Sequence, residues 1–231
     1  MKKLADVTCY MCSRPATSME HIPPKCIFPE IKDTDGVDYR KNLIKVPSCD
    51  EHNSNTSKDD ELFMIVVTAY FQSAGVADLH FNTKVKRALD HSPKFRHHLV
   101  CTAQPLFLDG KFTYALQPDP RRIQKQLEKI GYGLYFEHFK QKWAKPVLVD
   151  TPARTHLQGI TANKDNLFWQ KLSNLVLVHF DDAPIYGENP EVFFYQMRVL
   201  PGTQFVIARV VIFNGFVINI AYDMSDPDLG T

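Results

Sequence analysis

Two short pairs of metal-binding residues near the N-terminus constrain this chain most. The first pair is Cys9 and Cys12, the second is Cys49 and His52, and two residues separate the members of each pair. A tight turn with this spacing aims two side chains at one ion, and four such ligands complete a tetrahedral zinc site. A redox Cys pair would need a strand before it and a βαβ setting, which the short preceding segment does not offer. The spacing therefore predicts one structural Zn²⁺ held by Cys9, Cys12, Cys49 and His52.

Composition indicates a globular protein. The 231 residues are 44% hydrophobic and 12% aromatic, which suffices for one large domain or two small ones. The formal net charge of +1 argues against a protein that coats DNA by charge alone, but it allows a local basic face. Five cysteines, three of them in the predicted zinc site, indicate a reducing compartment. No apolar run suggests a signal peptide or a membrane span, so we expect a cytoplasmic protein without membrane association.

An acidic residue followed by histidine, Glu20-His21, lies between the two ligand pairs. Pro23 and Pro24 follow at once, so an extended segment is expected here rather than a helix. A carboxylate can bind a divalent cation through oxygen, and a neutral imidazole can accept a proton from water. Alone, the doublet would indicate a structural histidine bonded to the backbone, or a further zinc ligand. Its position between two ligand pairs favours a catalytic role.

Taken together, these positions resemble the HNH endonucleases with a ββα-metal fold. The similarity is greatest to the zinc-containing subgroup typified by phage endonuclease VII, which reads C-x-x-C, then acid–His, then C-x-x-C-N. Here the last block is Cys49-x-x-His52-Asn53. Residues 48–61 are also similar to small bacterial HNH proteins of antiphage defence. The resemblance is confined to the N-terminal part of the chain.

The resemblance implies a metal-dependent endonuclease that hydrolyses DNA phosphodiester bonds. His21 would be the general base that activates water. Glu20 and Asn53 would coordinate one catalytic Mg²⁺ or Mn²⁺, and Asn42 would hold the loop that carries His21 by hydrogen bonds. The defence proteins further suggest a role against phage with an ATPase partner.

Two lysines are candidate contacts to the DNA backbone. Lys25 follows the Glu20-His21 doublet closely, and Lys58 falls on the helix expected after Asn53. For Lys58 an ordinary solvated helix position is an equally good interpretation.

Two departures from the subgroup leave alternatives open. His52 stands where the subgroup has Cys, so it could instead bind the catalytic metal, with Cys26 recruited to zinc. We favour His52 on zinc, because Asn53 then falls at the position of the subgroup's metal ligand. The charged segment 28–41 is longer than a minimal hairpin loop, and we expect a surface insertion there.

The pattern as a whole predicts an α+β fold. We expect an N-terminal zinc-stapled ββα-metal module over residues 1–75, then an α+β region of unknown role over 76–231, with helices and an antiparallel sheet. Acids at the start, glycine at the end and helical apolar spacing predict the helices. These are expected from about residue 53 or 57 to 74, over 78–99 with a break at Pro93, and over 118–143 with Gly131 and Gly133 weakening its middle.

Strands and turns are expected in the rest of the chain. Alternation around Asp109-Gly110 predicts a hairpin over 106–116, and residues 147–155 suggest a linker. The apolar run 175–180 is a strand candidate, and 186–190 suggests a turn. Further strands are expected over 192–200, 204–213 and 216–221, with a hairpin turn at Asn214-Gly215.

The alternative function is a non-catalytic module in which zinc stabilises a surface that binds nucleic acid or another protein. Glu20, His21 and Asn53 discriminate between the two, because a pure binding module does not need an acid–histidine pair beside a zinc hairpin.

Overall fold

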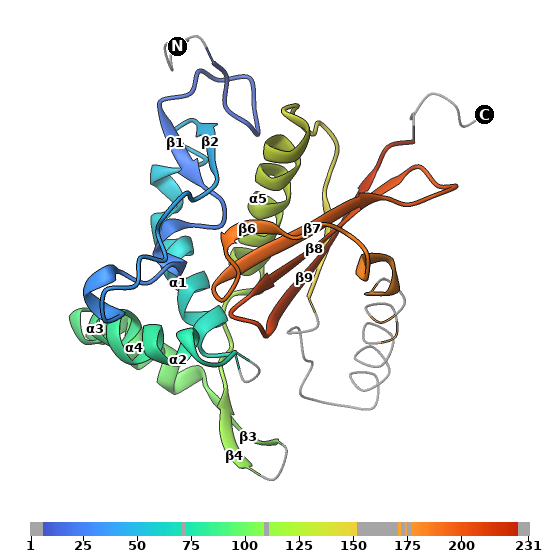
Figure 1. The fold of residues 1–231 in the computed structure, drawn as a ribbon. Helices are drawn as coiled ribbons and strands as arrows, with labels where there is room; N and C mark the ends of the chain where they lie inside the picture. Colours follow the sequence, from blue (N-terminus) through green and yellow to red (C-terminus); the bar gives the residue numbers. More distant parts are fainter. Residues whose placement is uncertain are drawn as a thin grey trace.

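The computed structural model describes residues 7–70, 73–108, 111–151, 171, 174 and 177–225, without the side chains of residues 106, 108 and 111–114. The fold is α+β, as predicted (Figure 1). Helices and an N-terminal hairpin lie on one side of the long helix α5, and a five-stranded antiparallel sheet lies on the other.

The N-terminal part has the β–β–α order expected of the module. Strand β1 (Ser18–His21) pairs antiparallel with β2 (Lys45–Ser48), and this register sets His21 across from Lys45. A 3-10 turn (Ser54–Thr56) then leads into helix α1 (Ser57–Thr68). The helix ends earlier than residue 74, where we expected it to end. At its C-terminus Ser73 Oγ donates a hydrogen bond of 2.8 Å to the carbonyl of Val67, which satisfies an acceptor that the last turn leaves open.

A run of short helices follows. It comprises α2 (Val76–His80), a π-helical turn (Phe81–Val85), α3 (Lys86–His91) and α4 (Pro93–Thr102). The predicted break at Pro93 is confirmed, because α3 ends before Ser92 and Pro93 begins the next helix. Proline fits that first position, where no intrahelical N–H bond is required. The predicted hairpin is also present as β3 (Gln104–Leu108) and β4 (Lys111–Ala115).

Helix α5 (Pro120–Phe139) lies between the N-terminal hairpin and the sheet. Asp119 caps its start by accepting a bond of 3.0 Å from the backbone N–H of Arg121. The two glycines that weaken the helix on propensity grounds permit close packing. A Cβ at Gly133 would lie 2.4 Å from Cγ1 of Ile22, and one at Gly131 would lie 2.8 Å from Cγ1 of Val147.

The C-terminal sheet has the strand order β5-β9-β8-β7-β6. Its strands are β5 (Leu148–Asp150), β6 (Tyr186–Asn189), β7 (Phe193–Val199), β8 (Phe205–Ile212) and β9 (Phe216–Asp223). The last three match the predicted strands. A hairpin turn joins β8 and β9 as predicted, but its central residues are Phe213 and Asn214, with positive φ of 50° and 57°, rather than Asn214 and Gly215.

Three predictions for this region are wrong. Residues 148–150 form an edge strand on β9 rather than part of a linker. Residues 186–189 form strand β6 rather than a turn, because they pair with β7. The strand candidate at 175–180 is a 3-10 turn over Val178–Phe180, and residues 175 and 176 lie outside the described part. Only Phe180 of that turn is buried, and Gln196 Nε2 donates to its carbonyl at 2.8 Å.

One hydrophobic core joins the two predicted domains. Phe63 of α1 packs edge-on against Phe216 of β9, with ring centroids 5.9 Å apart, and Phe28 packs against Phe193 at 6.3 Å. The same cluster of buried side chains extends from Cys9 to Tyr222. No helix among the described residues has the length and apolarity that a membrane crossing requires.

Candidate metal centre and pocket

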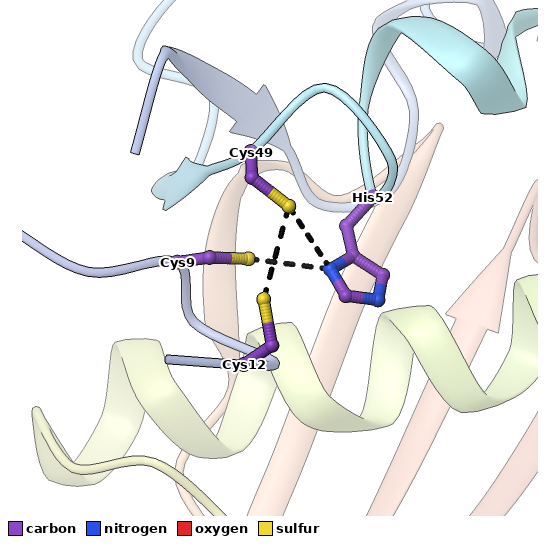
Figure 2. A group of neighbouring side chains, drawn as sticks. All are labelled: Cys9, Cys12, Cys49 and His52. Atoms are coloured by element: carbon purple, nitrogen blue, oxygen red, sulfur yellow. Dashed lines mark hydrogen bonds between the residues drawn. The ribbon is translucent and has the colours of Figure 1, made fainter. Parts of the chain in front are cut away.

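The four predicted zinc ligands come together at one end of the β1–β2 hairpin (Figure 2). Cys9 and Cys12 precede β1, and Cys49 and His52 follow β2. Because the strands are antiparallel and Ser18 pairs with Ser48, the segment before β1 lies beside the segment after β2. The antiparallel pairing therefore brings together two ligand pairs that are far apart in the sequence.

The geometry of this cluster fits a zinc ion. With Zn–S of about 2.3 Å and Zn–N of about 2.0 Å, tetrahedral ligands lie about 3.5 to 3.8 Å apart. The Sγ atoms of Cys12 and Cys49 are 3.8 Å apart. His52 Nδ1 lies 3.4 Å from Cys9 Sγ and 3.3 Å from Cys49 Sγ. Burial lowers the pKa of His52, which favours the neutral imidazole that binds metals. This Cys₃His cluster could hold a structural metal ion such as zinc.

Hydrogen bonds to backbone carbonyls hold the two ligand turns. The N–H of Cys9 donates to Arg14 O at 2.8 Å, and the N–H of His52 donates to Cys49 O at 3.1 Å. Lys142, which follows α5, donates from Nζ to the carbonyl of Cys12 at 2.8 Å. Such contacts orient ligands before a metal arrives.

Cys26 is not part of the cluster. Its thiol donates to the carbonyl of Asp60 at 3.4 Å, and burial raises its pKa to about 12. The four ligand atoms that lie close enough together to hold one ion belong to Cys9, Cys12, Cys49 and His52. The structure thus gives no support to the alternative in which Cys26 replaces His52.

A pocket of about 320 Å³ opens where the end of β1 meets the start of α1 and the helices that follow. Four residues predicted for the functional site lie in its wall: Glu20, His21, Lys25 and Asn53. The other residues of the wall are Pro24, Cys26, Ser57, Asp60, Glu61, Met64, Lys84 and Ala88. The pocket thus brings together an imidazole, an amide, three carboxylates and two lysines.

The buried carboxylate of Glu20 has one free oxygen. Its Oε1 lies 3.0 Å from Nζ of Lys129, a lysine of α5 that is only 3% exposed. Its Oε2 has no hydrogen-bond partner among the described residues. Burial raises the pKa of Glu20 to about 7, and Lys129 opposes that rise without cancelling it. An orphaned acceptor of this kind fits a cation that would occupy the pocket.

Lys129 also binds a second carboxylate of the pocket. Its Nζ lies 3.1 Å from Asp60 Oδ1 and donates to Thr56 Oγ1 at 2.7 Å. Among the described residues, only the Cys₃His cluster groups three or more ligand atoms closely enough to hold an ion by themselves. That observation does not exclude Mg²⁺, which commonly uses one or two carboxylates and completes its shell with water and substrate phosphate.

His21 stands half-buried at the end of β1, where it can remain neutral. Burial lowers its pKa to about 4, and the charges of Lys45, Lys25 and Arg40 add to this effect in that order. At neutral pH the imidazole is therefore uncharged.

Asn53 is anchored to β1 by its amide nitrogen. Its Nδ2 donates to Ser18 Oγ at 2.7 Å, so its Oδ1 is the atom that could bind a metal. Asn42 and Lys58 lie outside the pocket. Asn42 is exposed in a turn with φ of 50°, and its side chain forms no hydrogen bond with a described residue. Lys58 is exposed in the first turn of α1.

The sequence interpretation missed several residues around the pocket. Asp60 and Glu61 belong to a visible run of acids, Asp59-Asp60-Glu61, to which we assigned no role in the site. Lys45 follows from the β1–β2 register once that register is known. Nothing in the sequence singles out Lys129, because it lies in an ordinary amphipathic helix.

Comparison with known proteins found no match among protein families, curated proteins or solved structures. The resemblance to HNH endonucleases therefore has support only from the Cys₃His cluster, which is compatible with a zinc-containing module of that kind.

Proposed function

We propose that this protein is a metal-dependent HNH-type endonuclease that hydrolyses DNA phosphodiester bonds. The observation that carries the proposal is the pocket beside the candidate zinc centre, whose wall contains Glu20, His21 and Asn53. These residue types match the base and the oxygen ligands that such a hydrolysis requires.

Each residue has a chemical task in the proposed reaction. Neutral His21 accepts a proton from the attacking water as the new P–O bond forms and the bond to the 3′ oxygen breaks. Glu20 and Asn53 hold one Mg²⁺ or Mn²⁺, which when bound stabilises charge on the phosphate and on the departing oxygen. The zinc cluster has no part in the chemistry and fixes the hairpin that carries His21.

The resemblance to antiphage-defence proteins extends this proposal to a cytoplasmic role against phage beside an ATPase partner.

The second candidate is a non-catalytic module, stabilised by zinc, that binds nucleic acid or protein. The contacts of Lys129 favour it, since a buried lysine already compensates Glu20 and Asp60. The pocket would then be a structural polar cavity rather than a place for a catalytic metal.

Nicking of supercoiled plasmid DNA distinguishes the two candidates. We expect the zinc-loaded protein to nick plasmid when Mg²⁺ or Mn²⁺ is added, and His21→Ala to lower the rate by at least about 100-fold, the usual contribution of a general base. His98→Ala, an exposed histidine on α4, is the matched control and should keep full activity. Undiminished nicking by a folded His21→Ala protein would refute the role of His21, and no nicking by wild type would favour the second candidate.

A further inference from the structure

Two exposed lysines flank His21 where the pocket opens. The β1–β2 register sets Lys45 directly across from His21, and Lys25 lies in the wall of the pocket. Both side chains are exposed. After burial, the charges of these two lysines are the largest causes that lower the pKa of His21, which agrees with their closeness to the imidazole.

The other cations near the pocket already take part in ion pairs with carboxylates. Lys84 Nζ lies 3.2 Å from Glu30 Oε1, and an Arg40 nitrogen lies 3.3 Å from the same oxygen. Lys129 is buried against Glu20 and Asp60. In contrast, Lys25 and Lys45 form no ion pair with any residue that the structure describes. Their charge is available to a ligand.

The charges around His21 are thus largely segregated, apart from half-buried Glu61 in the pocket wall. The carboxylates of Glu20 and Asp60 lie on the inner side of the pocket, where Lys129 reaches them from α5. The two free ammonium groups lie on the solvent side. A divalent cation suits the inner side, and a polyanion suits the outer side.

We infer that Lys25 and Lys45 form a clamp that binds the DNA phosphates next to the scissile bond. The DNA backbone then crosses the β1–β2 hairpin at the end where His21 and Lys45 lie opposite each other. It does not follow the first turn of α1, where Lys58 is exposed outside the pocket. The inference rests on the proposed function and adds to it the residues that contact the substrate.

The salt dependence of DNA binding tests the clamp without any need for cleavage. The full-length, zinc-loaded protein is titrated into a short fluorescein-labelled DNA duplex without Mg²⁺ or Mn²⁺, and anisotropy gives the Kd over a KCl series. Each phosphate contact contributes about 0.9 to the slope of log Kd against log salt concentration. We expect Lys25→Gln and Lys45→Gln each to reduce that slope by about one, and the double variant to reduce it by about two.

Three further variants make the result specific. Lys45→Arg keeps the charge and should restore most of the slope. Lys140→Gln removes an exposed charge that is paired with Glu137. Lys58→Gln removes the lysine that would contact the DNA if its backbone followed α1 instead. Both should leave the slope unchanged. A double variant with the wild-type slope, an equal loss in Lys58→Gln, or a wild type that does not bind DNA would each overturn the clamp.

The binding test and the nicking test can fail independently, so the clamp and the proposed nuclease activity are tested separately. Lysine-dependent binding without nicking would support the clamp in a nucleic-acid-binding module and remove the nuclease. Nicking with a slope that is insensitive to Lys25 and Lys45 would keep the nuclease and remove the clamp.

Discussion

At the scale of single residues, Lys129 is the side chain on which the pocket depends most. It is almost fully buried, and its ammonium group faces two carboxylates and a hydroxyl. Burial of an ion in a protein costs several kcal/mol unless partners compensate it. Lys129 therefore makes it possible for Glu20 and Asp60 to lie together below the surface.

Replacement of Lys129 by methionine should destabilise the protein. The variant keeps the volume of the side chain but leaves buried Glu20 and half-buried Asp60 without their counter-ion, and breaking a buried pair in this way costs about 3 to 5 kcal/mol. The free energy of unfolding in urea measures the loss. Lys125→Met, an exposed lysine of the same helix, is the control and should change it by less than about 0.5 kcal/mol. Equal stability of the two variants would show that Lys129 does not compensate the pocket.

The residues of the candidate site differ in how far the sequence could predict them. Cys9, Cys12, Cys49 and His52 were predictable because ligand spacing within a turn is a local property, and the structure brings them together. Lys129 was not predictable, because its importance arises from packing between segments that are distant in sequence. A charged residue in an amphipathic helix is usually solvated, and no local pattern marks this exception.

At the scale of elements, α5 is the support on which the N-terminal hairpin rests. Its Gly133 lets Ile22, the residue directly after His21, pack against the helix backbone. Glycine costs about 1 kcal/mol in a helix interior relative to alanine. Here that cost is offset by a contact which fixes the segment that carries His21.

Gly133→Ala should therefore destabilise the protein in spite of its better helix propensity. The new Cβ would lie 2.4 Å from Ile22 Cγ1 and 2.6 Å from its Cδ1, so Ile22 must move. Overpacking of this kind costs about 1 to 3 kcal/mol. Thermal unfolding measures the loss, and Ile22→Ala should relieve the clash, so that the double variant loses less than the sum of the single variants. Additive losses would contradict a direct contact between the two residues.

Element prediction succeeded where local signals were strong and failed where pairing decides the structure. The proline at 93 and the many Val, Ile and Phe residues of β8 and β9 are local signals, and both were interpreted correctly. Residues 148–150 and 186–189 are strands only because β9 and β7 supply their hydrogen bonds. An apolar run such as 175–180 is compatible with helix or strand, since periodicity does not separate the two over so short a length.

At the scale of the whole molecule, the candidate zinc centre is part of a continuous core. Buried Cys9 and Cys49 belong to the same cluster of side chains as Trp143 and Tyr222. The α+β class was predictable from composition and periodicity. It was not predictable that residues on both sides of position 75 share one core, because a sequence shows which residues are apolar but not which of them are in contact.

Loss of zinc should therefore disturb the packing of core residues that lie far from the metal. Structural zinc is worth on the order of 10 kcal/mol of folding free energy in small sites. We expect Cys49→Ser, made in a Trp169→Phe background so that Trp143 is the only tryptophan, to lose zinc in elemental analysis and to expose Trp143, seen as a red shift of its fluorescence. Cys101→Ser, an exposed thiol outside the cluster, should change neither quantity. A zinc-free Cys49→Ser protein with native fluorescence would show that the core around Trp143 does not depend on the metal centre.

The packing of Ile22 on α5 has a consequence for the order in which the protein becomes competent during synthesis. The ribosome releases the two cysteine turns and both hairpin strands well before it releases the residues around Gly133. Until those residues emerge, Ile22 lacks the helix on which it packs, and Glu20 and Asp60 lack Lys129. Under the proposed function, a product truncated before α5 would therefore be harmless to the DNA of the cell that makes it.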